Sequence, residues 1–372
     1  MNSGGRLANA FTVVVAAWLA AQAHGDPLPE EVGVVAMPAP QPHWFMTVGA
    51  TGGYLFDGGS GEMVGKIDKP AYGPAITVDH QRGMLYIPGS YYSRGSYGER
   101  TDAVVFHALE SLAPIAEVEV PPKIAAIGHR GMNNLVGSRH LAVYNLTPAA
   151  SVSIVDVQAR AFAGEIATAG CAMVYPLNDA RFMQICGDGT LQVIGLDAAG
   201  GEASRERSAR FFDVDQDPLF DYAVPNAEGW ILVSHEGQVF AARFDQGIDI
   251  GEPWRLATTG DATANWRVGG GQPFAFHESS GTFYALMHQG GKDTHSDPGT
   301  EIWAFKMDHK RRALRIKLPE AARAINVVGT AQPLLIVLST EPRTVLVHDA
   351  NTGRLLRRID DAGQAPYSLQ RF

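Results

Sequence analysis

The feature that most constrains the fold is a unit that recurs along the chain: an alternating β-prone run, a polar turn and a second apolar run. Seven copies start near residues 53, 104, 152, 191, 239, 302 and 345, which are 39 to 63 residues apart. That length suits four short strands with their turns. A single unit of this kind would leave its apolar faces exposed, so the units are expected to stack on one another.

Radial stacking of such units predicts an all-β fold, a seven-bladed β-propeller of four-stranded antiparallel blades, because a ring removes most exposed sheet edges. The last segment, residues 367–372, is expected to pair with a strand near residues 43–48 and close the ring. The alternative is a pair of β-sandwiches. No linker or low-complexity boundary divides the chain, so residues 26–372 are predicted to form a single domain.

Composition narrows the classes of partner and agrees with a turn-rich globular protein. The 372 residues include 41 Gly and 22 Pro, more than an average protein but fewer than a disordered one. Acidic residues outnumber basic ones by 39 to 30, giving a net charge of -9. Nucleic acid is therefore excluded as a partner, because binding it needs a basic surface.

The amino-terminal residues 1–25 are typical of a secretory signal peptide. Arg6 is followed by a short apolar stretch and then by small residues around Ala21 and Ala23. The alternative is an uncleaved anchor, but no basic cluster follows the apolar run. No second run approaches the roughly 18 residues needed to cross a bilayer. We therefore expect an exported, periplasmic protein without a membrane span.

Cys171 and Cys186 are the only cysteines of the chain, and they lie fifteen positions apart. In an oxidising compartment this spacing predicts a disulfide across a hairpin, worth about 3 kcal/mol in the chain-entropy account. A metal-binding pair is the weaker alternative, because the close Cys-x-x-Cys spacing of zinc sites is missing.

Catalytic motifs are hard to find, so no catalytic, cofactor-binding or metal-binding residue is predicted on this chain. There is no Walker loop, nucleotide-binding fingerprint, His-Glu-x-x-His or Gly-x-Ser-x-Gly sequence. Some residues could form a metal cluster or an acid–base pair, but their sequence context fits surface loops better than either site. The candidates are His277, His288, His295 and Asp293 for the metal, and Asp215 and Asp217 for the acid–base pair.

Aromatic residues concentrate in two places where rings can line a mouth or a partner-facing surface. One is residues 44–46 (WFM), at the start of the predicted core. The other is Tyr91, Tyr92 and Tyr97, in the Ser- and Gly-rich segment 89–98. Core packing is the alternative explanation for both groups.

Several longer stretches resemble the heavy subunit of the quinoprotein amine dehydrogenases, and the resemblance runs from about Phe45 to the end of the chain. They are Arg94 and residues 98–102 (GERTD), 148–149 (PA), 154–156 (IVD), 170–171 (GC), 182–189 (FMQICGDG), 217–220 (DPLF), 265–270 (NWRVGG), 287–288 (MH), 291–292 (GK), 294–295 (TH) and 301–303 (EIW). In these details the chain looks more similar to the heavy subunit of aromatic amine (aralkylamine) dehydrogenase than to that of methylamine dehydrogenase.

The resemblance implies a periplasmic heterotetramer of two heavy and two light subunits. Such an oxidoreductase converts a primary amine to an aldehyde and ammonia and passes electrons to a blue-copper protein, azurin or amicyanin. The cofactor, tryptophan tryptophylquinone, and the catalytic Asp belong to the light subunit. This chain would then carry no cofactor and would hold the light subunit in place.

The resemblance also implies one direct contribution of this chain, because two residues that border the family's substrate channel fall on Phe45 and Val48. A ring there can select among amines, since one methylene changes discrimination by about 1–3 kcal/mol. Val48 is smaller than the aliphatic residue of the aromatic enzymes, which leaves the preferred amine open. The alternative functions are a methylamine dehydrogenase heavy subunit and an exported propeller that binds a partner without catalysis.

Overall fold

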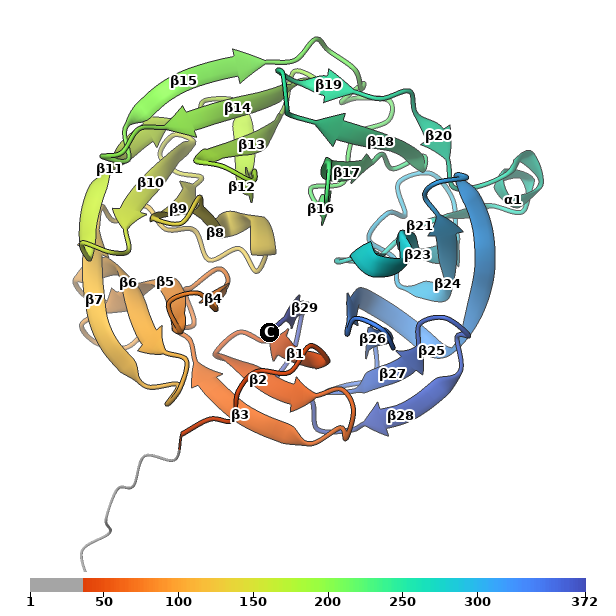
Figure 1. Cartoon of the computed structure of the whole chain (residues 1–372), viewed down its shortest axis with the longest axis horizontal. Coiled ribbons are helices and arrows are strands. Elements are labelled where there is room, and N and C mark those ends of the chain that lie inside the picture. The colour runs from red at the N-terminus through yellow and green to blue at the C-terminus, as the bar shows by residue number, and fades with distance from the viewer. Residues whose placement is uncertain (1–35) are drawn as a thin grey trace, which may run out of the picture. The chain divides into compact units, whose positions relative to one another are not determined.

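The computed structural model describes residues 36–372, in which antiparallel sheets are arranged in a ring around a central axis (Figure 1). The predicted signal peptide, residues 1–25, lies outside the described residues. The described part contains one short α-helix, α1 (Thr259–Thr263), and two 3-10 turns, η1 (Arg130–Met132) and η2 (Glu278–Ser280). No helix between residues 36 and 372 is long and apolar enough to span a bilayer.

Four sheets have four strands each, and within each sheet every strand pairs with the next one named. They are β29 (Ser368–Arg371), β1 (Trp44–Val48), β2 (Gly52–Asp57), β3 (Met63–Asp68); β4 (Thr77–Asp79), β5 (Met84–Tyr92), β6 (Arg100–Ala108), β7 (Pro114–Val120); β8 (Asn133–Val136), β9 (His140–Asn145), β10 (Ser151–Asp156), β11 (Ala161–Ala167); and β12 (Cys171–Pro176), β13 (Arg181–Cys186), β14 (Leu191–Leu196), β15 (Glu202–Arg207).

Two sheets are larger. The five-stranded sheet contains β16 (Val224–Asn226), β17 (Gly229–Val233), β18 (Gln238–Arg243), β19 (Asp249–Ile250) and β20 (Trp254–Arg255). The remaining sheet contains β21 (Trp266–Val268), β22 (Phe274–His277), β23 (Thr282–Gln289), β24 (Gly299–Lys306), β25 (Arg311–Val328), β26 (Leu334–Ser339), β27 (Val345–Asp349) and β28 (Leu355–Ile359). It has eight strands, including β22, which pairs with β23 as β21 also does.

The prediction of seven four-stranded blades is therefore wrong, because hydrogen bonding joins the described strands into six sheets, one of them eight-stranded. The cause is β25, an unbroken strand of 18 residues. Its first part pairs with β24 and its last part with β26, and Ala322 pairs with both Gly299 and Ser339. The repeats that start near residues 302 and 345 thus share one sheet, since no turn separates them.

The ring is closed by pairing between the two ends of the described chain, as predicted. Strand β29 runs antiparallel to β1, and Phe45 lies opposite Arg371 while Val48 lies opposite Ser368. The Gln272 side chain accepts a hydrogen bond from the Leu369 amide and donates one to the Leu369 carbonyl, both at 2.9 Å. These bonds tie the closing strand to the eight-stranded sheet as well.

Burial follows the position of a strand within its sheet. The middle strand β10 is buried at all six residues, whereas the outermost strand β15 (EASRER) is exposed at all six. Buried apolar side chains form clusters between neighbouring sheets, and removing their surface from water stabilises the ring by about 25 cal/mol per Å². The alternating apolar and charged runs of the sequence therefore mark the inner and outer strands.

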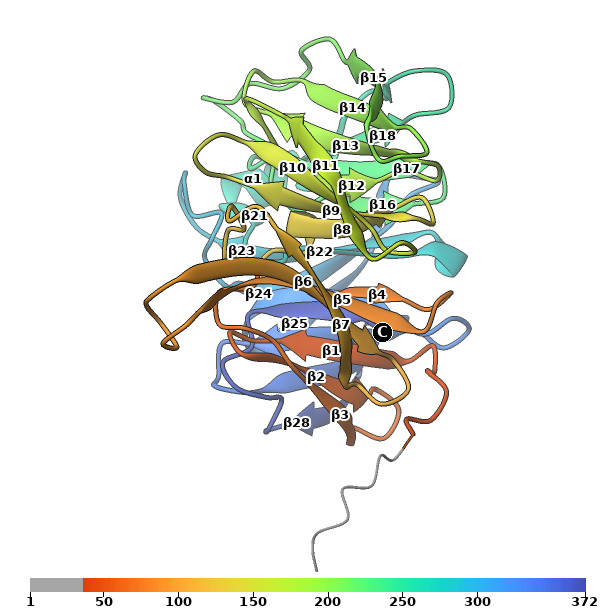
Figure 2. The same cartoon turned by 90° about the vertical axis from the view of Figure 1, so that its left-hand side faces the viewer.

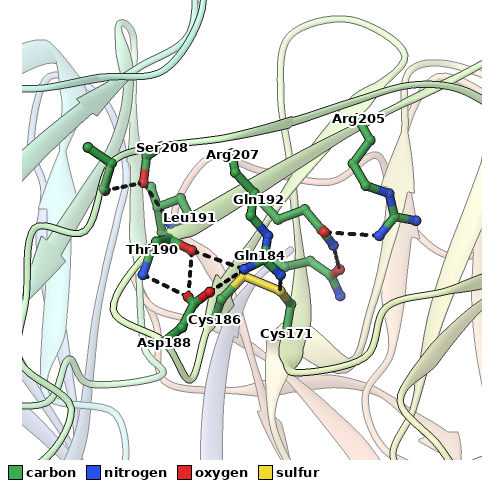
Figure 3. Close-up of polar contacts among 11 residues, drawn as sticks. Cys171, Gln184, Cys186, Asp188, Thr190, Leu191, Gln192, Arg205, Arg207 and Ser208 are labelled. Atoms are coloured by element: carbon green, nitrogen blue, oxygen red, sulfur yellow. Dashed lines mark hydrogen bonds and ion pairs between the residues drawn. A yellow bond between two sulfur atoms is a disulfide. The ribbon is translucent and has the colours of Figure 1, made fainter.

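The predicted disulfide is confirmed: Cys171 and Cys186 are bonded and lie opposite each other in the β12–β13 hairpin (Figure 3). Arg207 reaches the bond from β15, with its Nη2 3.0 Å from the Cys171 Sγ, and also forms an ion pair with Asp188. The bond and these contacts fasten the inner and outer strands of this sheet together.

Candidate docking face and substrate-channel residues

Phe45 and Val48, the two predicted channel residues, point to opposite sides of β1, because side chains alternate along a strand. Phe45 is fully buried and packs on Phe56, with ring centroids 5.5 Å apart, in the cluster that faces the eight-stranded sheet. Val48 is buried on the other side, with Ile76 and Ile87. The structure does not bring the two residues together, and their role in a channel stays a prediction.

The aromatic segment 89–98 forms the end of a long hairpin that projects from one face of the ring (Figure 2). Five exposed apolar side chains belong to this hairpin and to neighbouring loops at the same face, and we call them the docking face. They are Tyr72 (38% exposed), Tyr91 (38%), Tyr97 (61%), Ile127 (38%) and Leu146 (48%). The sequence pattern indicated the tyrosines of the hairpin, whereas folding brings the other three residues beside them.

The loops of the docking face are held to one another by specific contacts. Tyr72 pairs with Ser90 across an isolated β-bridge, and its ring lies 5.3 Å from that of Tyr92 in an edge-to-face arrangement. A second bridge joins Ile124 to Asn145, next to Leu146. Burial raises the pKa of the Tyr91 phenol, so this group stays neutral at any physiological pH. The exposed rings therefore sit on an ordered framework.

An ion pair beneath the hairpin explains two charged residues of the GERTD stretch. The guanidinium of Arg100 donates two hydrogen bonds to the Asp102 carboxylate, Nε to Oδ1 and Nη2 to Oδ2, each at 2.7 Å. Asp102 also accepts a bond from the Ile124 amide at 2.7 Å, and Arg100 donates to the Ile124 carbonyl at 2.9 Å. The carboxylate of Asp102 raises the pKa of Arg100, so the guanidinium stays charged. This pair fixes the hairpin against the loop that carries Ile127.

The histidines considered for a metal site have separate roles. His277 bonds with the Ser280 hydroxyl and with the Gly329 carbonyl, and His288 bonds with the Thr294 hydroxyl at 2.8 Å. No group of three or more possible metal ligands occurs within residues 36–372. The metal alternative thus gains no support from the described part of the chain.

His295 takes part in a contact that sequence reasoning did not predict. Its ring stacks on that of His235, with centroids 3.9 Å apart and planes 19° apart. Burial and the neighbouring His295 both lower the pKa of His235. Sixty residues separate the two histidines in the chain, so only the folded ring brings them together.

Of the two acidic residues considered for acid–base chemistry, Asp217 has a structural role. Its carboxylate accepts bonds from the Ser234 hydroxyl, the Glu236 amide and the Gln238 side chain, each at 2.8 Å. Asp215 donates its backbone amide to the Asp213 carboxylate at 3.0 Å within an exposed turn. The Asp217 side chain therefore stabilises a local turn, whereas Asp215 takes part in its own turn through its backbone.

Comparison with known proteins identifies the family. The sequence model of the methylamine dehydrogenase heavy chain family matches residues 38–370. The chain belongs to this family. It is therefore the heavy subunit of an amine dehydrogenase, as the resemblance in the sequence predicts.

Curated relatives of this heavy subunit are methylamine dehydrogenase heavy chains. That of Methylophilus methylotrophus is 27% identical over 318 residues, which cover 84% of this chain and 78% of the relative. That of Paracoccus versutus is 26% identical over 319 residues, which cover 84% of this chain and 74% of the relative. The match therefore extends over most of both proteins.

Solved structures share the fold of the heavy subunit at much lower identity. A functionally unknown protein from Desulfotomaculum acetoxidans superimposes with a TM-score of 0.59 at 10% identity, covering 88% of this chain and 98% of that chain. The dihydro-heme d1 dehydrogenase NirN gives a TM-score of 0.56 at 14% identity, covering 86% and 64%. At this identity the similarity concerns the fold alone.

Proposed function

We propose that this chain is the scaffold subunit of a periplasmic amine dehydrogenase with two heavy and two light subunits. The complex oxidises a primary amine to an aldehyde and ammonia, using tryptophan tryptophylquinone on the light subunit, and passes the electrons to a blue-copper protein, azurin or amicyanin. The observation that carries the proposal is the family match over residues 38–370. Export to the periplasm rests on the signal-like residues 1–25.

The docking face is the proposed contact surface for the light subunit. Its five exposed apolar residues lie on the β5–β6 hairpin and on loops beside it, and the Arg100–Asp102 pair holds the hairpin against the loop that carries Ile127. Aromatic side chains with a polar tip are enriched at protein interfaces because they bury much apolar area and still reach a hydrogen-bond partner. Four other exposed large apolar residues, Met63, Ile115, Phe162 and Leu355, are spread over four outermost strands.

The quinone is proposed to reside on the partner, and the tryptophans of this chain fit a packing role. One pair, Trp266 and Trp303, is in contact, with ring centroids 5.4 Å apart. Trp303 is fully buried, its Nε1 donates to Glu301 at 2.7 Å, and Arg312 and Arg315 lie over its ring. This arrangement covers the ring with neighbouring side chains and gives no opening for an amine, so no catalytic step is assigned to it.

The proposed substrate is an aromatic primary amine, because of the sequence details that resemble the aromatic enzymes, and the alternative is methylamine. The names of the relatives favour the alternative. Phe45 and Val48 remain the proposed contribution of this chain to selection among amines. Val48 is the last residue of β1, and Phe45 is buried on the opposite side of this strand, so they would act by shaping the floor under the bound light subunit.

Co-purification tests the assembly. A tagged chain expressed with the short, cysteine-dense light subunit of the same source should elute as a complex of two heavy and two light subunits. Replacing Tyr97 or Ile127 with Ser should weaken the complex at least about tenfold, because each change removes an exposed apolar contact. Exposed Leu355, far from the docking face on β28, is the control position. Equal effects of Leu355→Ser would contradict the assigned surface.

A further inference from the structure

The central channel of the ring contains a cavity of about 480 Å³ that none of the preceding functions uses. Its lining comes from seven elements that border the axis: η1, β4, β8, β16, β22, β25 and β29 (Figure 1). Two arginines, Arg130 from η1 and Arg371 from β29, face it. A larger cavity of about 810 Å³ shares Arg130, Asn134 and Pro225 with it, so the two are adjacent.

The two guanidinium groups are anchored by backbone carbonyls and not by carboxylates. Arg371 donates from Nε to the Val327 carbonyl at 2.8 Å and from Nη2 to the Phe276 carbonyl. Arg130 donates from Nη2 to the Ala223 carbonyl. Within residues 36–372 neither side chain forms an ion pair with Asp or Glu. Each guanidinium has five N–H donors, so most of the ten remain available to a ligand.

The charges around the cavity are unbalanced. No Asp or Glu lines it, although the whole chain carries a net charge of -9. Loss of surrounding water lowers the pKa of Arg371, and the charge of Arg130 lowers it further. The carboxylate of Glu278 raises the pKa of Arg371, although it lies too far from the guanidinium to form an ion pair. Two like charges therefore share a channel whose lining contains no Asp or Glu side chain.

We propose that this channel binds a small oxyanion, such as phosphate, sulfate or a carboxylate, between Arg130 and Arg371. Guanidinium groups are the side chains best suited to such anions, because their planar N–H pairs match two oxygens at once. Gln370 and His80, which also line the cavity, add further side chains that can donate hydrogen bonds. The inference does not depend on the proposed amine oxidation.

Calorimetric titration of the full chain with phosphate, at ionic strength held constant with chloride, tests the proposal. The wild type should bind phosphate at one saturable site. Arg130→Gln and Arg371→Gln should each weaken binding at least about tenfold. The matched control is Arg255→Gln, which removes the same charge from the exposed outer strand β20 and should bind as the wild type does.

Two further variants separate anion binding from a structural role of the arginines. Glu278→Gln removes the opposing carboxylate while keeping an oxygen for the Ala227 amide, 3.2 Å away, and should tighten phosphate binding about twofold. Arg371→Lys keeps the charge but loses the planar pair of N–H groups, so it should bind phosphate more weakly than the wild type. This variant replaces Arg371→Gln in the test if the Gln variant fails to fold.

Titrations with sulfate and acetate then identify the class of anion that the site prefers. Tighter binding of sulfate indicates a tetrahedral oxyanion, and tighter binding of acetate indicates a carboxylate. Absence of a saturable site for all three anions would overturn the proposal. This is the result expected if the terminal carboxylate of Phe372, which lies at the same cavity, already binds the two arginines. Equal binding by the wild type and both Gln variants would overturn it as well.

Discussion

Replacement of Asp102 by Asn tests whether a buried ion pair holds the docking face in place. The Asp102 side chain is fully buried and Arg100 is one-third exposed, at 33%. Asn keeps the shape of the side chain and an oxygen for the Ile124 amide, which is 2.7 Å from the carboxylate. The substitution therefore removes the charge and leaves the guanidinium of Arg100 without its partner.

The expected loss follows from burial. Removing one partner of a fully buried pair destabilises a protein by about 3–5 kcal/mol, and the partial exposure of Arg100 reduces this to about 2–3 kcal/mol. The matched control is Asp360→Asn. Asp360 pairs with Arg358 at the same two-residue spacing, 2.5 Å apart, but is 74% exposed. A surface pair of this kind contributes less than about 1 kcal/mol.

The assay is urea unfolding of the wild type and of both variants, combined with the affinity of each for the light subunit. Asp102→Asn should lower the free energy of unfolding more than Asp360→Asn does, and should weaken light-subunit binding at least about tenfold by loosening the hairpin. Equal unfolding midpoints for the two variants would refute the reasoning. Unchanged affinity of Asp102→Asn for the light subunit would show that the Arg100–Asp102 pair does not support the docking face.

Three further predictions concern other parts of the ring. Replacing Cys171 and Cys186 together with Ala should lower the free energy of unfolding by about 3 kcal/mol, and a wild type indifferent to reductant would contradict this. Phe45→Leu should change the ratio of kcat/KM for aromatic amines and methylamine in the assembled enzyme, and an unchanged ratio assigns Phe45 to packing alone. Burial lowers the pKa of His129 to about 4. The neutral ring therefore contributes about 3 kcal/mol to the free energy of unfolding above pH 6.5, and this contribution is lost as the pH falls towards 4. His129→Asn, which keeps an acceptor for the Gly131 amide, should flatten that pH dependence of unfolding.

Local patterns predicted much of the fold because they report on neighbouring strands. The disulfide joins two strands of one hairpin, and ring closure follows from a β-prone segment left over at each end. The number of separate sheets could not be predicted, because it depends on how β25 joins β24 to β26. Ala322 pairs on both sides, and nothing in a run of alternating residues distinguishes a strand shared by two repeats from two strands with a turn.

The candidate sites show a similar division. The tyrosines of the hairpin stand out in the sequence because they occur in a Ser- and Gly-rich segment, but Ile127 and Leu146 become part of the docking face only through the pairing of loops. Arg130 and Arg371 meet in the channel although they come from distant parts of the chain. Such sites need the register of the ring, which no single repeat contains.

The most direct test of the account compares amine-dependent dye reduction and quinone absorbance in the purified chain, alone and in complex with its light subunit. The account predicts neither signal from the chain alone and both from the complex. Amine oxidation by the isolated chain would contradict the central claim that this ring positions a partner that performs the chemistry.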